Sequence, residues 1–559
     1  MSTVKPTWWK EMSVYQIWPR SFADGNNDGI GDLHGVLEKL DYIKSLGVDA
    51  IWFSPLYPSP NCDYGYDCAD YMNIHPEYGD LKLFKKVLDG AHERGMKVIM
   101  DLVINHTSDQ HEWFQKSKEQ QKNKYHDYYI WRKGKGKDGK KPPNNWLSLF
   151  EGGAWEYNKN RDEHYLHVFA KGQPDLNMAN PAVREEVKDI MRFWLELGVD
   201  GFREDVITYI AKREGLPNGF PLPIATGFKH YTSLPAVKDY LREFKEDVLD
   251  HYGAITVGEA PMMTTKVAKD YITGNDKVLD MMFHFQHMEA DCFMNDWVPR
   301  PFSLKRLKKV FAHWQQEMYG VGWNANYLEN HDHPRIINRY GSLKYRVESA
   351  KMLAAMFVLQ SGTPFIYQGQ EIGMTNIALE RLDQFKDVVT HNNYRLAKKI
   401  GFSEKFFVKY ANRRSRENAR TPMQWSDERN GGFSEVEPWF NVNPNHTEIN
   451  VKAAENDENS ILHWYRALLE FRRENPMVVY GKYREHYKSS RSLYVFSSEH
   501  EGKRLLVIGS FTEKPVQFSA PAGFDLLHGK QVFGNYAIPA TQSNTFITKP
   551  WECRVYVWN

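Results

Sequence analysis

Short apolar runs alternate with longer amphipathic runs along most of the chain. The first short run spans residues 13–17, and residues 33–46 then place apolar side chains near the helical period up to a stop at Gly47. The run at 97–104 is apolar at almost every position, a pattern typical of a parallel strand that is covered on both faces. The alternation predicts eight strands, at residues 13–17, 48–53, 97–104, 200–206, 255–258, 281–285, 324–328 and 364–367.

Eight alternating strand–helix units predict a closed (β/α)8 barrel, the TIM barrel. Two long polar segments interrupt the alternation, and the first is too long to be a structureless loop, so we expect a small inserted domain there. Near the C-terminus, short apolar runs separated by turns predict an antiparallel β-sandwich domain. The predicted divisions are residues 1–104 and 175–482 for the barrel, 105–174 for the inserted domain, 371–455 for a second insertion, and 483–559 for the β domain.

Composition and charge exclude several classes of protein. The chain has 559 residues, of which 42% are hydrophobic and 26% charged, so intrinsic disorder is excluded. The 72 Lys and Arg residues balance 71 Asp and Glu residues, which gives no electrostatic reason to expect nucleic-acid or membrane binding. Met1–Lys10 lacks the apolar core of a signal peptide, and no apolar run is long enough for a membrane helix.

The cysteines indicate the cellular compartment in which we expect the protein. They are too few and too scattered for a disulfide framework, although the first two could pair. We expect free thiols and a cytoplasmic protein. The four are Cys62, Cys68, Cys292 and Cys553.

Carboxylates stand at the ends of three predicted strands, where the catalytic groups of a TIM barrel lie. They are Asp205, Glu259 and Asp332. One such residue alone is most often an exposed acid beside a loop. Three together at strand ends, with His and Arg beside them, indicate a catalytic site.

The strand around Asp205 illustrates how these groups could work. Arg203 and Asp205 are two residues apart, so they lie on the same face of a strand. An Arg in that place favours the ionised form of Asp205, which suits a nucleophile. Glu204 points to the opposite face, and we expect a structural role for it. Glu259 follows the apolar run 255–257, and a carboxyl in such surroundings suits a general acid.

Five segments resemble the signature segments of the α-amylase superfamily, glycoside hydrolase family 13. They are Asp101–His106, Gly201–Asp205, Gly258–Glu259, Asn330–Asp332 and Gln173–Asn177, the last in the form carried by the oligo-1,6-glucosidase group. The resemblance runs from Trp8-Trp9-Lys10 to the β domain. It implies a retaining α-glycosidase with Asp205 as nucleophile and Glu259 as acid and base, ~5–5.5 Å apart. Asp332 would bind sugar hydroxyls and support the transition state.

The same resemblance implies a pocket with one closed end, as in exo-acting α-glucosidases of the family. Asp63 and Arg420 would form a charge pair on the 4- and 6-hydroxyls of the terminal glucose. By itself such a pair could be a surface salt bridge worth ~0–1 kcal/mol. Tyr66 would stack on the sugar ring, and Arg203 would orient the nucleophile. The other residues placed around the glucose are His106, His331, Phe150, Phe169 and Gln173.

Val206, directly after the predicted nucleophile, bears on the linkage. In this group Val accompanies α-1,6 activity, whereas Ala or Thr accompanies α-1,4 activity. A branched side chain beside the leaving sugar would penalise the α-1,4 geometry by ~1–3 kcal/mol. The sequence departs from the group at His333, which follows Asp332, and at Ala260-Pro261, which follows Glu259. We expect both departures to face the leaving group.

The main hypothesis is an exo-acting α-glucosidase for α-1,6-linked isomalto-oligosaccharides. The alternatives within the family are an α-1,4-glucosidase, a sucrose-hydrolysing or sucrose-isomerising enzyme, and a transglucosylase. Sucrose isomerases carry an Arg-Leu-Asp-Arg-Asp segment where this chain has Met288–Cys292, and Arg381–Gln384 comes too late to replace it. Non-catalytic transporter subunits with this fold have lost carboxylates that this chain retains. We expect an oligosaccharide substrate and a monomer or weak homo-oligomer.

A loop after the first predicted strand has the ligand spacing of a cation site. Oxygen-bearing groups stand at every second position, as in the first nine positions of an EF-hand, with Gly29 at the sharp turn. Gly35 replaces the closing Glu, so a full EF-hand is excluded, and an Asx-rich turn without metal is the alternative. Spacing and resemblance together predict a structural Ca²⁺ or Mg²⁺ and no organic cofactor. The ligands would be Asp24, Asn26, Asp28, Asp32 and the Ile30 carbonyl.

Overall fold

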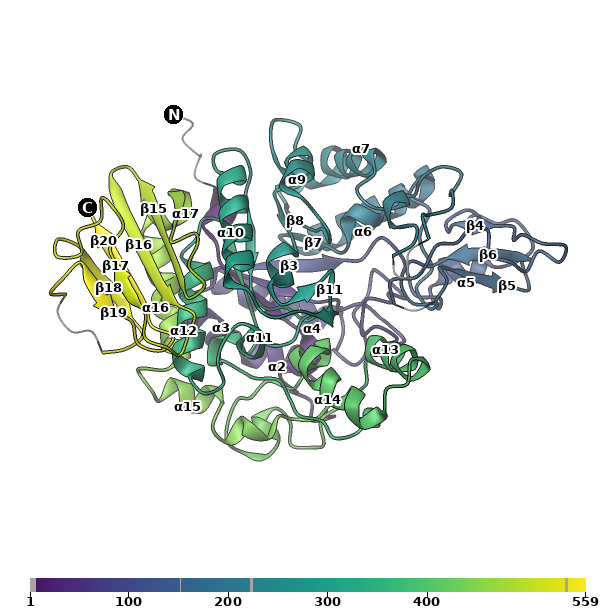
Figure 1. Cartoon of the computed structure of the whole chain (residues 1–559). Helices are drawn as coiled ribbons and strands as arrows, with labels where there is room; N and C mark the ends of the chain where they lie inside the picture. The colour runs from purple at the N-terminus through teal and green to yellow at the C-terminus, as the bar shows by residue number, and fades with distance from the viewer. Residues whose placement is uncertain (1–6, 151, 222–224, 538–540) are drawn as a thin grey trace.

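The central sheet of this computed structural model is a barrel of eight parallel strands (Figure 1). The structure describes residues 7–150, 152–221, 225–537 and 541–559, so residues 1–6 of the segment examined for a signal peptide lie outside it. A bridge between Met282 and Asn324 joins the last strand of the sheet to the first, and the prediction of a TIM barrel is confirmed. In sheet order the strands are β12 (Ala325–Tyr327), β13 (Thr363–Tyr367), β1 (Val14–Ile17), β2 (Ala50–Phe53), β3 (Lys97–Leu102), β7 (Gly201–Glu204), β8 (Ile255–Glu259) and β9 (Met281–Phe283).

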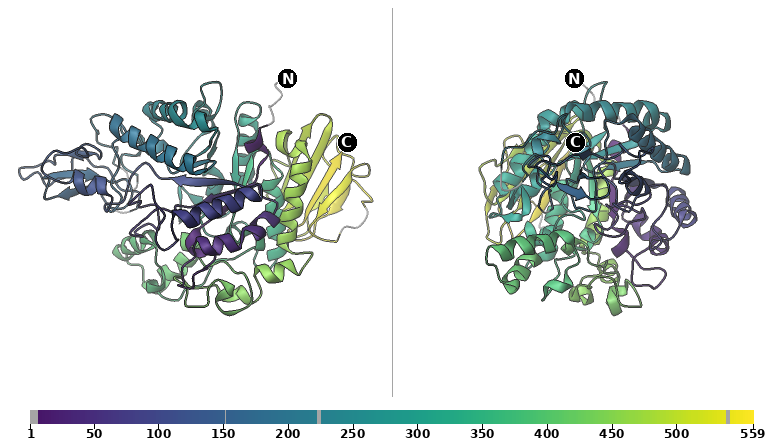
Figure 2. Two further views of the ribbon diagram at one scale, coloured as in Figure 1. Left: turned by 180° about the vertical axis from the view of Figure 1, so that it is seen from behind. Right: turned by 90° about the vertical axis from the view of Figure 1, so that its right-hand side faces the viewer.

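Buried apolar side chains fill the barrel. Helices surround it, as the right-hand view of Figure 2 shows. Trp52, Phe283 and Phe365 come from three strands and pack with ring centroids 4.6 to 6.2 Å apart. The covering helices are α4 (Leu81–Glu93), α6 (Pro181–Leu197), α7 (Pro235–Phe244), α9 (Thr265–Ile272), α10 (Leu304–Met318), α12 (Arg346–Val358) and α16 (Ile461–Glu474).

Local signals explain how these helices begin and end. The Asn180 side chain accepts a hydrogen bond from the Ala182 amide at the start of α6, and Gly198 ends that helix with a φ of 114°. The single helix expected over residues 33–46 is wrong, because the chain forms α2 (Leu33–Glu38) and α3 (Leu40–Ser45). Lys39 lies between them with φ −99° and ψ 5°, outside the α-helical range, and its ammonium lies 4.7 Å from the centre of the Trp425 ring.

Two segments outside the barrel helices flank the C-terminal ends of the strands. The inserted domain holds helix α5 (Glu112–Ser117) and a sheet of β4 (Trp131–Arg132), β6 (Glu163–Leu166) and β5 (Trp155–Asn158). The second insertion holds α13 (Val388–Lys399) and α14 (Glu404–Arg414) around its own apolar cluster, which includes Phe385 and Phe407. Both segments are therefore ordered parts of the molecule.

The C-terminal domain lies at the end of the molecule opposite the inserted domain (Figures 1 and 2). Phe518 and Phe546 of its small sheet pack on Leu506 and Tyr556 of the large sheet, which makes the predicted sandwich. The large sheet runs β14 (Lys482–His486), β15 (Leu493–His500), β16 (Lys503–Ser510), β20 (Cys553–Trp558) and β18 (Lys530–Gly534), and the small sheet pairs β17 (Gln517–Ser519) with β19 (Thr545–Ile547).

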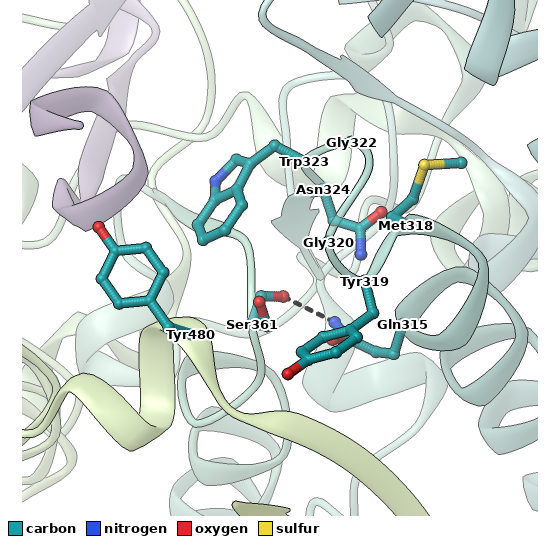
Figure 3. A pocket seen from close by; sticks show the side chains of 9 residues that line it. All are labelled: Gln315, Met318, Tyr319, Gly320, Gly322, Trp323, Asn324, Ser361 and Tyr480. Atoms are coloured by element: carbon teal, nitrogen blue, oxygen red, sulfur yellow. Dashed lines mark hydrogen bonds between the residues drawn. The ribbon is translucent and has the colours of Figure 1, made fainter. Parts of the chain in front are cut away.

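A small pocket lies at the amino end of β12 (Figure 3). Its volume of about 10 Å³ is enough for roughly one water molecule. Gln315 and Ser361 line it and are joined by a hydrogen bond of 2.7 Å. Because the amino end of a strand faces away from the carboxyl ends, this pocket is separate from the predicted catalytic groups.

The Glu204 carboxyl group has an unusual environment. Glu204 at the end of β7 is fully buried, and neither of its carboxyl oxygens has a hydrogen-bond partner. Burial, with a smaller contribution from Asp280, raises the pKa of Glu204 to about 8.

All four cysteines are free. Over the described part of the chain, none of the helices has both the length and the apolar content needed to cross a bilayer.

Candidate active site

Arg203 gathers three carboxylates at the carboxyl ends of β3, β7 and β8. Its Nη1 donates to Asp101 Oδ1 at 2.7 Å and to Asp205 Oδ1 at 2.6 Å, and its Nη2 lies 2.7 Å from Glu259 Oε1. The guanidinium is 1% exposed, so these ion pairs are shielded from water. Asp205 and Glu259 thus sit on the two terminal nitrogens of one guanidinium, the close spacing that suits a retaining pair.

The turn after β7 fixes this arrangement. The strand predicted over residues 200–206 is too long, since β7 ends at Glu204 and Val206 adopts a φ of 35°. That conformation is rare for a β-branched residue and stores strain. The Val206 amide donates to Glu259 Oε2 at 3.0 Å, while its side chain belongs to a buried apolar cluster that includes Tyr209. The turn therefore holds Glu259 beside Asp205 and places Val206 next to both.

The pKa values of the cluster reflect burial as well as charge. Burial raises the pKa of Asp101 to about 6 and the pKa of Asp205 well above its usual range, although Arg203 acts in the opposite direction on both. Arg203 favours the ionised form of Asp205, as expected, but burial outweighs this effect on the pKa, because one guanidinium faces three buried carboxylates. It follows that the three carboxylates share a proton, and an acid catalyst needs such a proton.

Asp332, the third predicted carboxylate, has a different environment. It lies 2.9 Å from Arg416 Nη1, 3.1 Å from Arg420 Nη2 and 3.1 Å from His331 Nε2. Burial raises the pKa of Asp332, but His331, Arg416 and Arg420 outweigh it and hold that pKa well below its usual range. Its side chain is 28% exposed, so an ionised carboxylate opens into the site.

The predicted charge pair of Asp63 with Arg420 is wrong. Asp63 Oδ1 pairs with Arg416 Nη2 at 2.7 Å, and no ion pair joins Asp63 to Arg420. Arg420 instead donates to the His331 carbonyl at 3.0 Å and lies 4.3 Å from the centre of the Trp18 ring. These two contacts turn the Arg420 side chain away, whereas Arg416 reaches Asp63 from the other end of the same short helix.

The remaining predicted residues come together around the same cluster. Tyr66 stacks on His331 at 5.1 Å and donates to Asp101 at 3.0 Å. Gln173 donates to Asp63 at 3.1 Å and lies 3.2 Å from His106. Burial lowers the pKa of both His106 and His331 to about 4.

Two aromatic residues of the inserted domain complete the wall. The Phe169 ring lies 5.0 Å from His106 and 5.3 Å from the Phe150 ring, and Arg416 lies 5.6 Å from the centre of Phe150. The inserted domain and the second insertion therefore meet over the barrel end. Between them they close one side of the cluster.

Comparisons with known proteins agree with this geometry. Residues 16–481 match the family model described as the alpha-amylase catalytic domain. The chain belongs to the α-amylase family. It is 46% identical over 556 residues to the oligo-1,6-glucosidase of Parageobacillus thermoglucosidasius, covering 98% of both chains. It is 45% identical over 558 residues to the oligo-1,6-glucosidase of Bacillus cereus, covering 98% of this chain and 99% of that one.

Solved structures of α-amylase family proteins superpose over almost the whole chain. The trehalose-6-phosphate hydrolase of Bacillus licheniformis is 41% identical with a TM-score of 0.93, covering 99% of this chain and 100% of that one. The isomaltulose synthase of a Klebsiella species is 38% identical with a TM-score of 0.94, covering 99% of each chain. Family membership makes this chain a glycoside hydrolase.

Sequence reasoning missed residues of this α-amylase family site. Arg416 contacts Asp63, Asp332 and Asp387, each within 3.0 Å. Gln16 on β1 lies 2.8 Å from His331 Nδ1. The position of Arg416, four residues before Arg420, was the available signal, since a short helix brings both ends of that segment to one place. Asp387 gave no such signal, because it is an ordinary helix-capping Asp in sequence.

The cation loop presents oxygens that are mostly engaged with its own backbone. Asp24 accepts from the Asn27 and Gly29 amides at 2.7 and 2.8 Å, and Asp32 accepts from the Gly35 amide at 2.7 Å. Among the residues that the structure describes, no three His, Cys, Asp or Glu side chains form a group that could hold a metal. The donors are nonetheless all oxygens, which fits a hard cation. The Gly29 carbonyl accepts from the Trp439 amide at 2.9 Å, so the loop supports the second insertion.

Proposed function

We propose that this chain is an exo-acting α-glucosidase that releases terminal, non-reducing, α-1,6-linked glucose from isomalto-oligosaccharides with retention of configuration. The observation that carries the proposal is the pair of carboxyls, Asp205 and Glu259, held on one guanidinium next to a closed end. The likeness to two oligo-1,6-glucosidases and the presence of Val206 support the α-1,6 linkage.

A double displacement follows from the arrangement. With the proton of the cluster on Glu259, the ionised Asp205 attacks the anomeric carbon while Glu259 gives that proton to the glycosidic oxygen. A covalent glucosyl-enzyme forms as the leaving sugar departs. Glu259 then takes a proton from water, which attacks the same carbon and releases Asp205. Asp332, kept ionised by Arg416 and Arg420, supports the positive charge that develops on the sugar ring.

The closed end accounts for release of single glucose units. Arg416 ties Asp63, Asp332 and Asp387 together, so that this side of the cluster is filled by ion pairs rather than open for a polymer. Gln173 adds a hydrogen bond to Asp63 from the inserted domain. A terminal glucose would enter with its 4- and 6-hydroxyls toward this end and its linkage toward Glu259.

The alternatives differ from this proposal in the leaving group or acceptor only. An α-1,4-glucosidase, a transglucosylase or a sucrose-active hydrolase or isomerase would use the same three carboxylates. Arg381, the only start of an isomerase-like Arg-Leu-Asp segment, forms an exposed pair with Asp383 on the surface. That placement favours hydrolysis over isomerisation of sucrose.

Free cysteines support a reducing, cytoplasmic setting, and we retain a monomer or weak homo-oligomer as the expected state.

Replacing Val206 tests the linkage. The purified enzyme is expected to release glucose from isomaltose with a higher kcat/KM than from maltose, with sucrose as a third substrate. Val206→Ala is expected to lower the isomaltose-to-maltose ratio of kcat/KM about tenfold, since methyl-scale contacts beside a reacting bond are worth ~1–3 kcal/mol. Chromatography of the products from all three sugars at equal concentration measures both quantities.

Val206→Ile is the matched control, because it keeps the branched side chain and is expected to keep the preference for isomaltose. A higher kcat/KM on maltose in the wild-type enzyme would contradict the α-1,6 proposal. Isomaltulose or trehalulose formed from sucrose would favour the isomerase alternative. An unchanged ratio in Val206→Ala would remove Val206 as the linkage determinant.

We also propose that the loop Asp24–Asp32 holds a structural Ca²⁺ or Mg²⁺, supported by its alternating oxygen donors. Removal of the ion with EDTA is expected to lower Tm by a few degrees, and CaCl2 or MgCl2 to restore it. Binding at about 100 times Kd stabilises a folded protein by roughly 2.7 kcal/mol. Scanning calorimetry with and without each ion measures this shift.

Asp28→Ala serves as the variant and Asp41→Ala as its control. Asp28 lies in the loop, so the Tm of the Asp28→Ala variant is expected not to depend on added ions. Asp41 is an exposed acid that pairs with Arg94 outside the loop, so its variant is expected to respond like the wild-type enzyme. Identical Tm values with EDTA, Ca²⁺ and Mg²⁺ would leave the Asx-rich turn as the correct interpretation.

A further inference from the structure

His333, one of the departures from the family pattern, has an unusual environment. Its Nδ1 lies 2.6 Å from Asp296 Oδ2 on strand β11 (Asn295–Pro299). The residue is only 8% exposed, and its Nε2 is buried and has no hydrogen-bond partner. An unpaired buried nitrogen costs free energy unless a ligand or water satisfies it.

Asp296 is itself held firmly. Its Oδ1 lies 2.8 Å from Arg339 Nη2, which also pairs with Asp291 Oδ1 at 2.7 Å, and Arg414 lies 3.0 Å from Asp291 Oδ2. Burial raises the pKa of Asp296, but Arg339, His333 and Arg414 outweigh it and lower that pKa to about 2. An ionised carboxylate only accepts hydrogen bonds, so His333 donates from Nδ1.

The tautomer of His333 follows from this contact. When Nδ1 carries the proton, Nε2 of the neutral ring is an acceptor. The sugar hydroxyls of a leaving group are donors, whereas the ring of a nitrophenol leaving group has none to offer. The free nitrogen therefore has the chemistry to distinguish the two kinds of leaving group.

The place of His333 in the barrel points to the leaving-group side. Asp63 and Arg416 close the site on the side of β2 and the second insertion, so the leaving sugar must lie toward Glu259 at the end of β8. The next strand in the sheet is β9, and the Phe285 ring that follows it lies 5.7 Å from His333. His333 itself directly follows Asp332 in the loop after β12.

We propose that His333, oriented by Asp296, accepts a hydrogen bond from a hydroxyl of the leaving sugar through Nε2 and is a specificity-determining residue for the leaving group. The proposal rests on the α-glucosidase function above and adds a contact for the sugar that departs. Asp296 acts through His333 and is a positioning residue.

Two substrates with the same glucose and different leaving groups test the contact. For His333→Ala, kcat/KM on isomaltose is expected to fall ten- to hundredfold, and kcat/KM on 4-nitrophenyl α-glucoside to stay within about twofold. Asp296→Asn is expected to act in the same direction, because an amide no longer fixes the tautomer. His333→Gln keeps an acceptor oxygen at similar reach and is expected to retain isomaltose activity within about threefold.

Asp291→Asn is the matched control. Asp291 shares Arg339 with Asp296 but does not contact His333, so its variant is expected to leave the ratio of the two kcat/KM values unchanged. Equal losses on both substrates in His333→Ala and His333→Gln would show a structural role and overturn the proposal, as would no loss on isomaltose. If the wild-type enzyme prefers maltose, the α-1,6 function fails, and the same comparison made with maltose still decides the role of His333.

Discussion

Asp205→Asn is expected to lower kcat by about 10⁴-fold or more on isomaltose and on 4-nitrophenyl α-glucoside alike, a loss of roughly 5.5 kcal/mol in transition-state stabilisation. The amide has the shape of the carboxylate but cannot form the covalent glucosyl-enzyme. Arg203 keeps its contacts to Asp101 and Glu259, so the fold and sugar binding are expected to persist. Initial rates, Tm and calorimetric titration with isomaltose measure the three properties.

The neighbouring residue provides the control for this variant. Glu204→Gln makes the same change from acid to amide one position earlier, on the opposite face of β7, where the carboxyl is buried away from the cluster. Its kcat is expected to stay within about threefold of the wild-type value. If Asp205→Asn retained a tenth of the wild-type kcat, Asp205 would not be the nucleophile.

Glu204→Gln is expected to have a large effect of its own, on stability. The pKa of Glu204 is raised by burial from 4.5 to about 8 in the folded chain. Between these values the folded state keeps a proton that the unfolded state has lost, so stability falls as pH rises. The cost grows by about 1.4 kcal/mol per pH unit across this window, which amounts to roughly 3–5 kcal/mol by pH 8.

The glutamine variant removes this titration. Its Tm is expected to exceed that of the wild-type enzyme by a few degrees at pH 8 and by progressively less toward pH 5, because the penalty vanishes near the unfolded-state pKa. Differential scanning calorimetry of both proteins from pH 5 to pH 8.5 gives the comparison. Parallel Tm curves over this range would mean that Glu204 is paired or hydrated in solution.

The active-site cluster shows why protonation required the structure. In sequence, Arg203 stands beside one acid, Asp205, and the pair looks balanced. In the fold the same guanidinium also holds Asp101 and Glu259, which come from β3 and β8. Burial, together with the neighbouring Glu259 and Asp101 carboxylates, therefore raises the pKa of Asp205 although Arg203 lowers it.

The charge pair at the closed end shows a second limit. Asp63 and Arg420 belong to segments that resemble the family over their whole length, and both residues do lie at the site. Which arginine reaches Asp63 depends on contacts made across the molecule, such as the Trp18 ring and the His331 carbonyl that hold Arg420. Side chains with long flexible stems choose among several acceptors, and sequence spacing does not rank those choices.

The sequence by itself determined the barrel and the strand ends that carry Asp205, Glu259 and Asp332, because apolar periodicity and chain order depend on local positions. Only the tertiary structure decided the pairing of Arg416 with Asp63, the strained turn at Val206 and the contact of His333 with Asp296. Each of these three features depends on segments that lie far apart in the chain. Their free energies come from burial and from electrostatic contacts that exist only after the barrel has closed.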